Sequence, residues 1–233
     1  MPLESRRIAL ANGSTSAVVA YPDSPVTRRD TAVILAHGAG NDMHTPFLSA
    51  VQAGLAAHGY ITVKFNFPYT DAGRKAPDRA PVLEACYARV LAAVRTDPSI
   101  AATRVVIGGK SLGGRMATHL AAQGAAVAGV LLLGYPLHPP KKVEQLRVAH
   151  LRNIRVPMLF IEGTRDTLCR LDLLQSTLAE LSAPTTLHII EGGDHSFNVP
   201  KALRRDPQAV WREIVTASVE WLEQLPARSE GEG

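Results

Sequence analysis

A serine between closely spaced glycines follows an aliphatic run near the middle of the chain. The segment GKSLG (109–113) comes directly after the run 104–108 and leads into a stretch with helical spacing. A sharp strand-to-helix turn of this kind exposes a serine hydroxyl, and it needs residues without a Cβ where strand and helix approach each other. The pattern predicts that Ser111 is a nucleophile. The alternative is that Ser111 is a helix N-cap after a tight glycine turn.

A serine nucleophile needs a base and an acid that orients the base, and two later aliphatic runs supply these residue types. Asp166 follows the run 157–163, and His195 follows the run 185–192. If the runs are neighbouring parallel strands, their carboxyl ends meet at one edge of the sheet, and both side chains converge on Ser111. Asp194 is a competing acid, but it is adjacent to His195, and the two side chains would point apart. The predicted catalytic residues are Ser111, His195 and Asp166.

Attack by a serine on a carbonyl creates an oxyanion, which two backbone N–H groups can stabilise. The amide of Leu112, at the start of the predicted helix, is one such donor. The glycine-rich segment 37–40 follows another aliphatic run, and we expect its Ala39 amide to be the second donor. His37 is expected to brace this loop by hydrogen bonding and to transfer no proton.

Two nucleotide-binding motifs begin in the same glycines but fail on spacing. A phosphate-binding P-loop needs a glycine five positions before Gly109, where the chain has Arg104. A dinucleotide-binding fingerprint that starts at Gly38 needs a glycine at Met43 and an acidic residue near Lys64. Basic residues also form no stripe interleaved with aromatics. The sequence therefore predicts no nucleotide cofactor and no nucleic-acid partner.

Short aliphatic runs alternate with helix-length amphipathic stretches along the chain, which predicts β–α–β units and a doubly wound, mostly parallel sheet with helices on both faces. An Asn-Gly pair at 12–13 between two alternating runs predicts an antiparallel hairpin at one edge of this sheet. The expected strands are 31–38, 61–67, 104–109, 127–134, 157–163 and 185–192. The expected helices are 46–59, 81–95, 112–124, 170–182 and 209–225.

Length and composition fit one α/β domain over residues 1–226, followed by a frayed polar tail at 227–233. The chain has 233 residues, 46% of them hydrophobic, and a net charge of +4, which excludes a disordered chain. Residues 116–140 carry no charge, but His119, Gln123 and Gly124 interrupt the run. We therefore expect a helix followed by a buried strand there, and no membrane span.

Two cysteines, Cys86 and Cys169, stand far apart without a Cys/His cluster. This spacing predicts neither a disulfide framework nor a structural zinc site, and both thiols are expected to be passive. The first residues include no apolar run of signal-peptide length. A reducing cytoplasm is the expected location.

The motifs together resemble those of small α/β-hydrolases of the dienelactone-hydrolase-like type. They stand as HGAGNDMHTPF (37–47), FNFPY (65–69), GGKSLGGR (108–115), GTRD (163–166) and GGDHSF (192–197), and they extend over nearly the whole chain. The chain resembles most closely the branch that contains a testis-expressed protein and the hydrolase-like domain of a histone-acetyltransferase (NSL) complex subunit. Dienelactone hydrolase itself uses a cysteine nucleophile. Because position 111 is serine, dienelactone chemistry is not carried over.

The resemblance implies an α/β-hydrolase fold and a serine hydrolase of carboxylesterase type, with no metal or organic cofactor. The expected partner is a small-molecule ester or acyl substrate, with thioester and amide as alternatives. A second hypothesis is a catalytically silent interaction module within a protein complex. Enzymes of this type often insert a lid in the segment that corresponds to residues 135–153. Because this segment is short, we expect an open active site. Five basic residues are expected near the mouth of this site, and we interpret them mainly as solvated surface charges: Arg74, Lys75, Lys110, Arg115 and Arg165.

Overall fold

The chain folds around one mixed sheet in the computed structural model, which describes residues 1–24 and 28–226. Within these residues eight strands pair in the order β1-β2-β4-β3-β5-β6-β7-β8. The strands are β1 (Leu3–Ala9), β2 (Ser14–Ala20), β3 (Thr31–Ala36), β4 (Ile61–Phe65), β5 (Arg104–Lys110), β6 (Gly129–Leu133), β7 (Met158–Gly163) and β8 (Thr185–Ile190). Every predicted central strand is present; β5 extends one residue beyond its predicted run, and the other five are slightly shorter than theirs. The tail predicted at 227–233 lies outside the described residues.

The N-terminal hairpin forms the predicted antiparallel edge. Strands β1 and β2 pair with Ala9 opposite Ser14, and the Leu10 amide donates to the Gly13 carbonyl across the turn, at 3.0 Å. Gly13 has φ +88°, a conformation that glycine adopts without a steric penalty. Strand β2 then pairs antiparallel with β4, and all other neighbours in the sheet are parallel.

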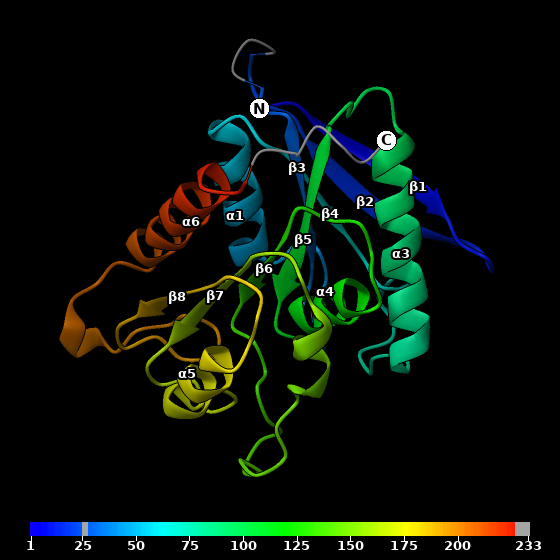
Figure 1. Ribbon diagram of the computed structural model, residues 1–233. Coiled ribbons are helices and arrows are strands. Elements are labelled where there is room, and N and C mark those ends of the chain that lie inside the picture. The colour runs from blue at the N-terminus through cyan, green and yellow to red at the C-terminus, as the bar shows by residue number, and fades with distance from the viewer. Residues whose placement is uncertain (25–27, 227–233) are drawn as a thin grey trace.

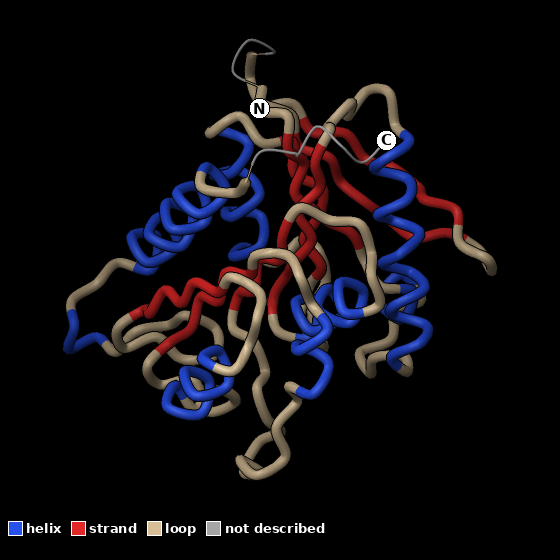
Figure 2. The backbone as a smooth tube through the Cα atoms, in the orientation of Figure 1, coloured by secondary structure: helices blue, strands red, loops and turns tan. Residues whose placement is uncertain are grey.

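Helices cover both faces of the sheet, as Figures 1 and 2 show. Helices α1 and α6 pack against each other over one apolar core, and α3, α4 and α5 cover the other core. The α-helices are α1 (Pro46–Ala57), α2 (Pro68–Asp71), α3 (Ala80–Thr96), α4 (Leu112–Ala122), α5 (Leu171–Ala179) and α6 (Pro207–Glu223). The short α2 and the 3₁₀ turns η2 (Ala149–Asn153) and η3 (Lys201–Leu203) were not predicted from the sequence.

Parallel pairing brings the carboxyl ends of the central strands to one edge of the sheet. In register, Ala36 of β3 lies opposite Gly109 of β5, and Gly163 of β7 lies opposite Ile190 of β8. The loops that follow these strands therefore emerge side by side. These loops carry Ser111, Asp166 and His195.

Candidate active site

Ser111 occupies the turn between β5 and α4 in a strained conformation. Its φ of 51° and ψ of −112° lie outside the regions that residues with a Cβ normally adopt. Its amide donates to the Leu133 carbonyl of the neighbouring strand, at 3.1 Å. Ser111 stands at the N-cap position of α4, but its hydroxyl makes no capping hydrogen bond. The turn therefore leaves the hydroxyl free for another partner.

Glycines around Ser111 allow α4 and β5 to approach strand β3 closely. A Cβ on Gly109 would lie 2.2 Å from the Ala36 carbonyl oxygen, and a Cβ on Gly113 would lie 2.3 Å from the same atom. Both distances are far below van der Waals contact, and the obstacle is backbone, which cannot rotate away. The glycine spacing that indicated a nucleophile turn is thus explained by packing against β3.

His195 reaches the serine from the loop after β8. Its Nε2 lies 2.8 Å from Ser111 Oγ. Asp194 stabilises this loop, because its Oδ1 accepts hydrogen bonds from the amides of Ser196, at 2.8 Å, and Asn198, at 2.9 Å. The carboxylate of Asp194 is therefore directed at its own loop and not at the imidazole.

Asp166 contacts the other nitrogen of the same imidazole. Its Oδ2 lies 2.6 Å from His195 Nδ1, and its Oδ1 accepts the Leu168 amide at 2.7 Å. The Asp166 side chain is 0% exposed, and that of His195 is 24% exposed. An ionised carboxylate only accepts hydrogen bonds, so the Nδ1 nitrogen carries the proton and Nε2 is the acceptor. Ser111, His195 and Asp166 thus form one hydrogen-bonded chain.

The loop after β3 lies against the serine. A Cβ on Gly38 would be 3.6 Å from the Ser111 Cβ, and the next residue, Ala39, is exposed. His37 is buried and accepts the Phe67 amide at Nε2, at 3.1 Å, while its Nδ1 donates to the Gly38 carbonyl, at 2.8 Å. Burial lowers the pKa of His37 and keeps the ring neutral. These contacts agree with the bracing function expected for His37.

A family model for the alpha/beta hydrolase domain matches residues 29–223 of the chain. The chain is an alpha/beta hydrolase. This assignment accounts for the sheet, the strained serine turn and the order of Ser111, Asp166 and His195 along the sequence.

Solved structures share this fold. An alpha-beta serine hydrolase homologue from Coxiella burnetii is 18% identical, with a TM-score of 0.75 over 93% of this chain and 97% of the other. A dienelactone hydrolase from Anabaena variabilis is 19% identical, with a TM-score of 0.75 over 97% and 99%. A serine hydrolase without a lid from Xanthomonas campestris is 18% identical, with a TM-score of 0.74 over 98% and 99%. At these identities the likeness concerns the fold.

Among residues 1–24 and 28–226 no separate lid domain is present, as expected from the sequence. Between β6 and β7 the described chain forms an irregular segment and the 3₁₀ turn η2, and its Tyr135 hydroxyl donates to the Arg147 carbonyl at 2.7 Å. None of the helices in the described part of the chain is long and apolar enough to cross a membrane.

The cysteines lie outside the hydrogen-bonded chain. Both are buried and unpaired, and burial raises the pKa of the Cys86 thiol to about 12 and that of Cys169 further still. Neither thiol forms a thiolate readily at neutral pH, so neither is a nucleophile. Among residues 1–24 and 28–226, no cluster of three His, Cys, Asp or Glu side chains is arranged to hold a metal ion.

Two basic residues near the serine, Lys110 and Arg115, differ from the expectation, and the half-buried Arg115 has no hydrogen-bond partner for its Nε atom among the described residues. Arg165 is exposed, and Arg74 forms an exposed ion pair with Asp78, as solvated surface charges do. The ammonium of Lys110 is instead buried, with no hydrogen-bond partner among the described residues. Its position at the last residue of β5 could have indicated burial, but nothing in the sequence indicated what surrounds it.

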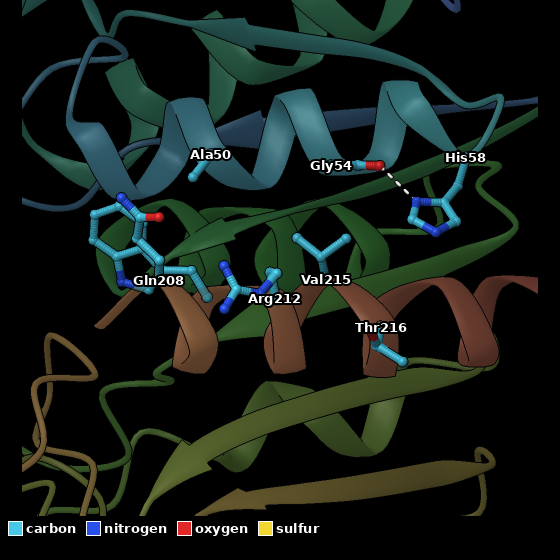
Figure 3. A pocket seen from close by; sticks show the side chains of 8 residues that line it. Ala50, Gly54, His58, Gln208, Arg212, Val215 and Thr216 are labelled. Atoms are coloured by element: carbon cyan, nitrogen blue, oxygen red, sulfur yellow. Dashed lines mark hydrogen bonds between the residues drawn. The ribbon is translucent and has the colours of Figure 1, made fainter. Parts of the chain in front are cut away.

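A hollow lies between α1 and α6 (Figure 3). It has a volume of about 400 Å³ and is lined by Ala50, Gly54, His58, Gln208, Trp211, Arg212, Val215 and Thr216. The Nδ1 atom of His58 donates a hydrogen bond to the Gly54 carbonyl, at 2.8 Å. No serine or cysteine lines the hollow, and the candidate active site is elsewhere, at the strand ends.

Proposed function

We propose that this alpha/beta hydrolase is a carboxylesterase-type serine hydrolase, and that Ser111, His195 and Asp166 are its catalytic triad. The observation that carries the proposal is the 2.8 Å contact between His195 Nε2 and Ser111 Oγ, on an imidazole whose other nitrogen donates to a buried carboxylate. This is the arrangement by which a neutral imidazole activates a hydroxyl.

The reaction proceeds through an acyl-enzyme. His195 takes the hydroxyl proton as Ser111 Oγ attacks the substrate carbonyl carbon, and the carbonyl π electrons move to the oxygen. The oxyanion collapses, the C–O bond to the alcohol breaks, and His195 gives its proton to the leaving alkoxide. Water then repeats the sequence: it loses a proton to His195, attacks the acyl carbon and releases the carboxylic acid and Ser111.

Asp166 orients His195 and stabilises the imidazolium that forms in each half-reaction. Its own second oxygen is held by the Leu168 amide, so the carboxylate cannot rotate without losing a hydrogen bond. For the oxyanion we propose the amides of Leu112, the first residue of α4, and Ala39, on the loop against the serine.

The proposed substrate is a small carboxylic ester, with thioesters and amides as further members of the same chemical class. The absence of a separate lid domain in the described chain supports an open site. On the resemblance of its sequence motifs, we propose that the chain is related most closely to the branch of the testis-expressed protein and the NSL-complex subunit. The two unpaired cysteines support a reducing location, which we propose is the cytoplasm.

Hydrolysis of p-nitrophenyl esters of graded acyl length tests the proposal. We expect release of p-nitrophenol by the wild type on at least one ester and a loss of about 10³-fold or more in kcat for Ser111→Ala. Folding of the variant is checked by circular dichroism. If the folded wild type is inactive across the panel and on thioester and amide analogues, the proposal is wrong, and an interaction module becomes the better explanation.

A further inference from the structure

Lys110 directly precedes the proposed nucleophile, but its side chain turns into the protein. The ammonium lies 5.3 Å from the centre of the Phe197 ring, within the range of a cation–π contact. Gly134 is a second neighbour, because a Cβ there would be 2.6 Å from Lys110 Nζ and 3.3 Å from the His195 carbonyl oxygen. The ammonium is therefore enclosed between the end of β6 and the loop that carries His195.

Acidic side chains surround this ammonium, but none of the described residues forms a close ion pair with it. Glu162 on β7, Asp166 after β7 and Asp194 after β8 all attract the charge of Lys110. Burial outweighs this attraction and lowers the pKa of Lys110 to about 8, so the side chain still carries its charge at pH 7 and below.

Glu162 is the other buried group behind the triad. It is 0% exposed, its Oε1 accepts the Tyr135 amide, and its Oε2 has no hydrogen-bond partner among the described residues. Burial and the neighbouring Asp166 carboxylate raise the pKa of Glu162, and Lys110 opposes that rise. Lys110, Glu162 and Asp166, the carboxylate that holds His195, therefore interact with one another behind the triad.

A purely structural function explains this arrangement poorly. A buried ammonium without a hydrogen bond is costly, and a methionine would fill the same space without that cost. Phe197 itself has a φ of 62°, an unfavourable conformation for an aromatic residue, and its ring is almost fully buried. The loop therefore holds an aromatic face toward the ammonium two residues after His195.

We propose that Lys110 is a positioning residue for the triad, whose buried positive charge keeps His195 neutral at mildly acidic pH and whose contact with Phe197 holds the His195 loop. The inference rests on the proposed function, because it assigns Lys110 to the same site. Removal of the charge leaves the Asp166 carboxylate unbalanced, so His195 takes up a proton at a higher pH. A protonated imidazole cannot accept the Ser111 proton.

The test is the pH profile of kcat/KM for an ester that the wild type hydrolyses, with Lys110→Met and Lys110→Gln as two neutral variants. We expect the acidic limb to move to higher pH by about one unit in each variant that folds. The loss is then about tenfold on that limb and shrinks toward pH 8, while KM changes little. Circular dichroism checks folding.

Arg165→Met is the matched control. Arg165 also stands beside Asp166 in the sequence, but it is exposed, so its charge is screened by water and salt. We expect its acidic limb to stay within about 0.3 pH units of the wild type. In 0.5 M NaCl the Lys110 variants should keep their shift, because a buried charge is poorly screened.

A second readout does not depend on turnover. Nuclear magnetic resonance of ¹³C-labelled histidine follows the protonation of His195 in the wild type and in Lys110→Met. The inference is overturned if the His195 titration and the acidic limb both coincide with those of the wild type. Absence of any esterase, thioesterase or amidase activity in the wild type would refute the proposed function, and the His195 titration would still decide whether Lys110 controls its charge.

Discussion

Replacement of Asp166 by asparagine isolates the function of the orienting acid. In the wild type both carboxylate oxygens accept hydrogen bonds, one from the Leu168 amide and one from His195 Nδ1. Asparagine keeps one acceptor and replaces the other with an NH₂ donor. The backbone amide of Leu168 can only donate, so the remaining oxygen stays there and the NH₂ group faces His195.

The imidazole adapts to this change by moving its proton. With a donor facing Nδ1, the ring carries its proton on Nε2, which then points at Ser111 Oγ and cannot accept the hydroxyl proton. Loss of the correct tautomer costs a serine triad about 10⁴-fold in kcat, or about 5 kcal/mol of transition-state stabilisation. We therefore expect kcat of Asp166→Asn to fall by about 10³- to 10⁴-fold with little change in KM.

Asp194→Asn is the matched control in the steady-state assay. It removes the same charge one residue from His195, but an asparagine oxygen still accepts the Ser196 and Asn198 amides that hold the loop. We expect a loss of less than about tenfold. A severe defect in Asp194→Asn beside nearly normal activity in Asp166→Asn, with both variants folded, would show that the wrong carboxylate has been assigned.

Three further predictions concern the two thiols, the half-buried His150 and the packing glycine Gly113. Alkylation of the native protein with iodoacetamide should leave esterase activity largely intact, because burial keeps both thiols protonated; loss of activity in step with modification would contradict this. Burial lowers the pKa of His150 in the folded protein to about 4. As the pH falls below 6.5, the imidazole is protonated in the unfolded chain before it is protonated in the folded chain, so the folded state loses stability between about pH 6.5 and 4. In urea unfolding from pH 7 to 5, the wild type should lose about 1 kcal/mol more than His150→Gln, a value reduced for the exposed part of the ring; equal losses would refute the assignment. Gly113→Ala should cost about 3 kcal/mol or more in urea unfolding, because its methyl group would lie 2.3 Å from the Ala36 carbonyl oxygen; Gly38→Ala, whose nearest neighbour would be 3.6 Å away, should fold with near wild-type stability, and similar losses in both would refute the packing argument.

The fold was predictable because its central strands are buried on both faces. Such strands appear as continuous aliphatic runs, and glycine or proline ends most of them, so their positions could be predicted from the sequence. Helix α2 was missed because four residues are too short for a periodic pattern. The turn η2 was missed because its residues make their contacts with α4, which is distant in sequence.

The sequence predicted the residues of the candidate site that follow strand ends. It did not predict the direction of a side chain that depends on packing between separate loops. The carboxyl ends of β5, β7 and β8 place Ser111, Asp166 and His195 together through backbone register alone. The direction of the Lys110 side chain depends on Gly134 and Phe197, which belong to other loops. No local sequence pattern records such a contact, so the residue was read as a surface charge.

Covalent labelling by a fluorophosphonate probe tests whether His195 activates Ser111, because only an activated serine attacks this phosphorus centre rapidly. We expect one adduct per chain, mapped to Ser111 by peptide mass spectrometry. No adduct should form in Ser111→Ala, and adduct formation should be slower by about 10²-fold or more in His195→Gln. Labelling that persists in Ser111→Ala, or that proceeds at the wild-type rate in His195→Gln, would contradict the claim that His195 activates Ser111.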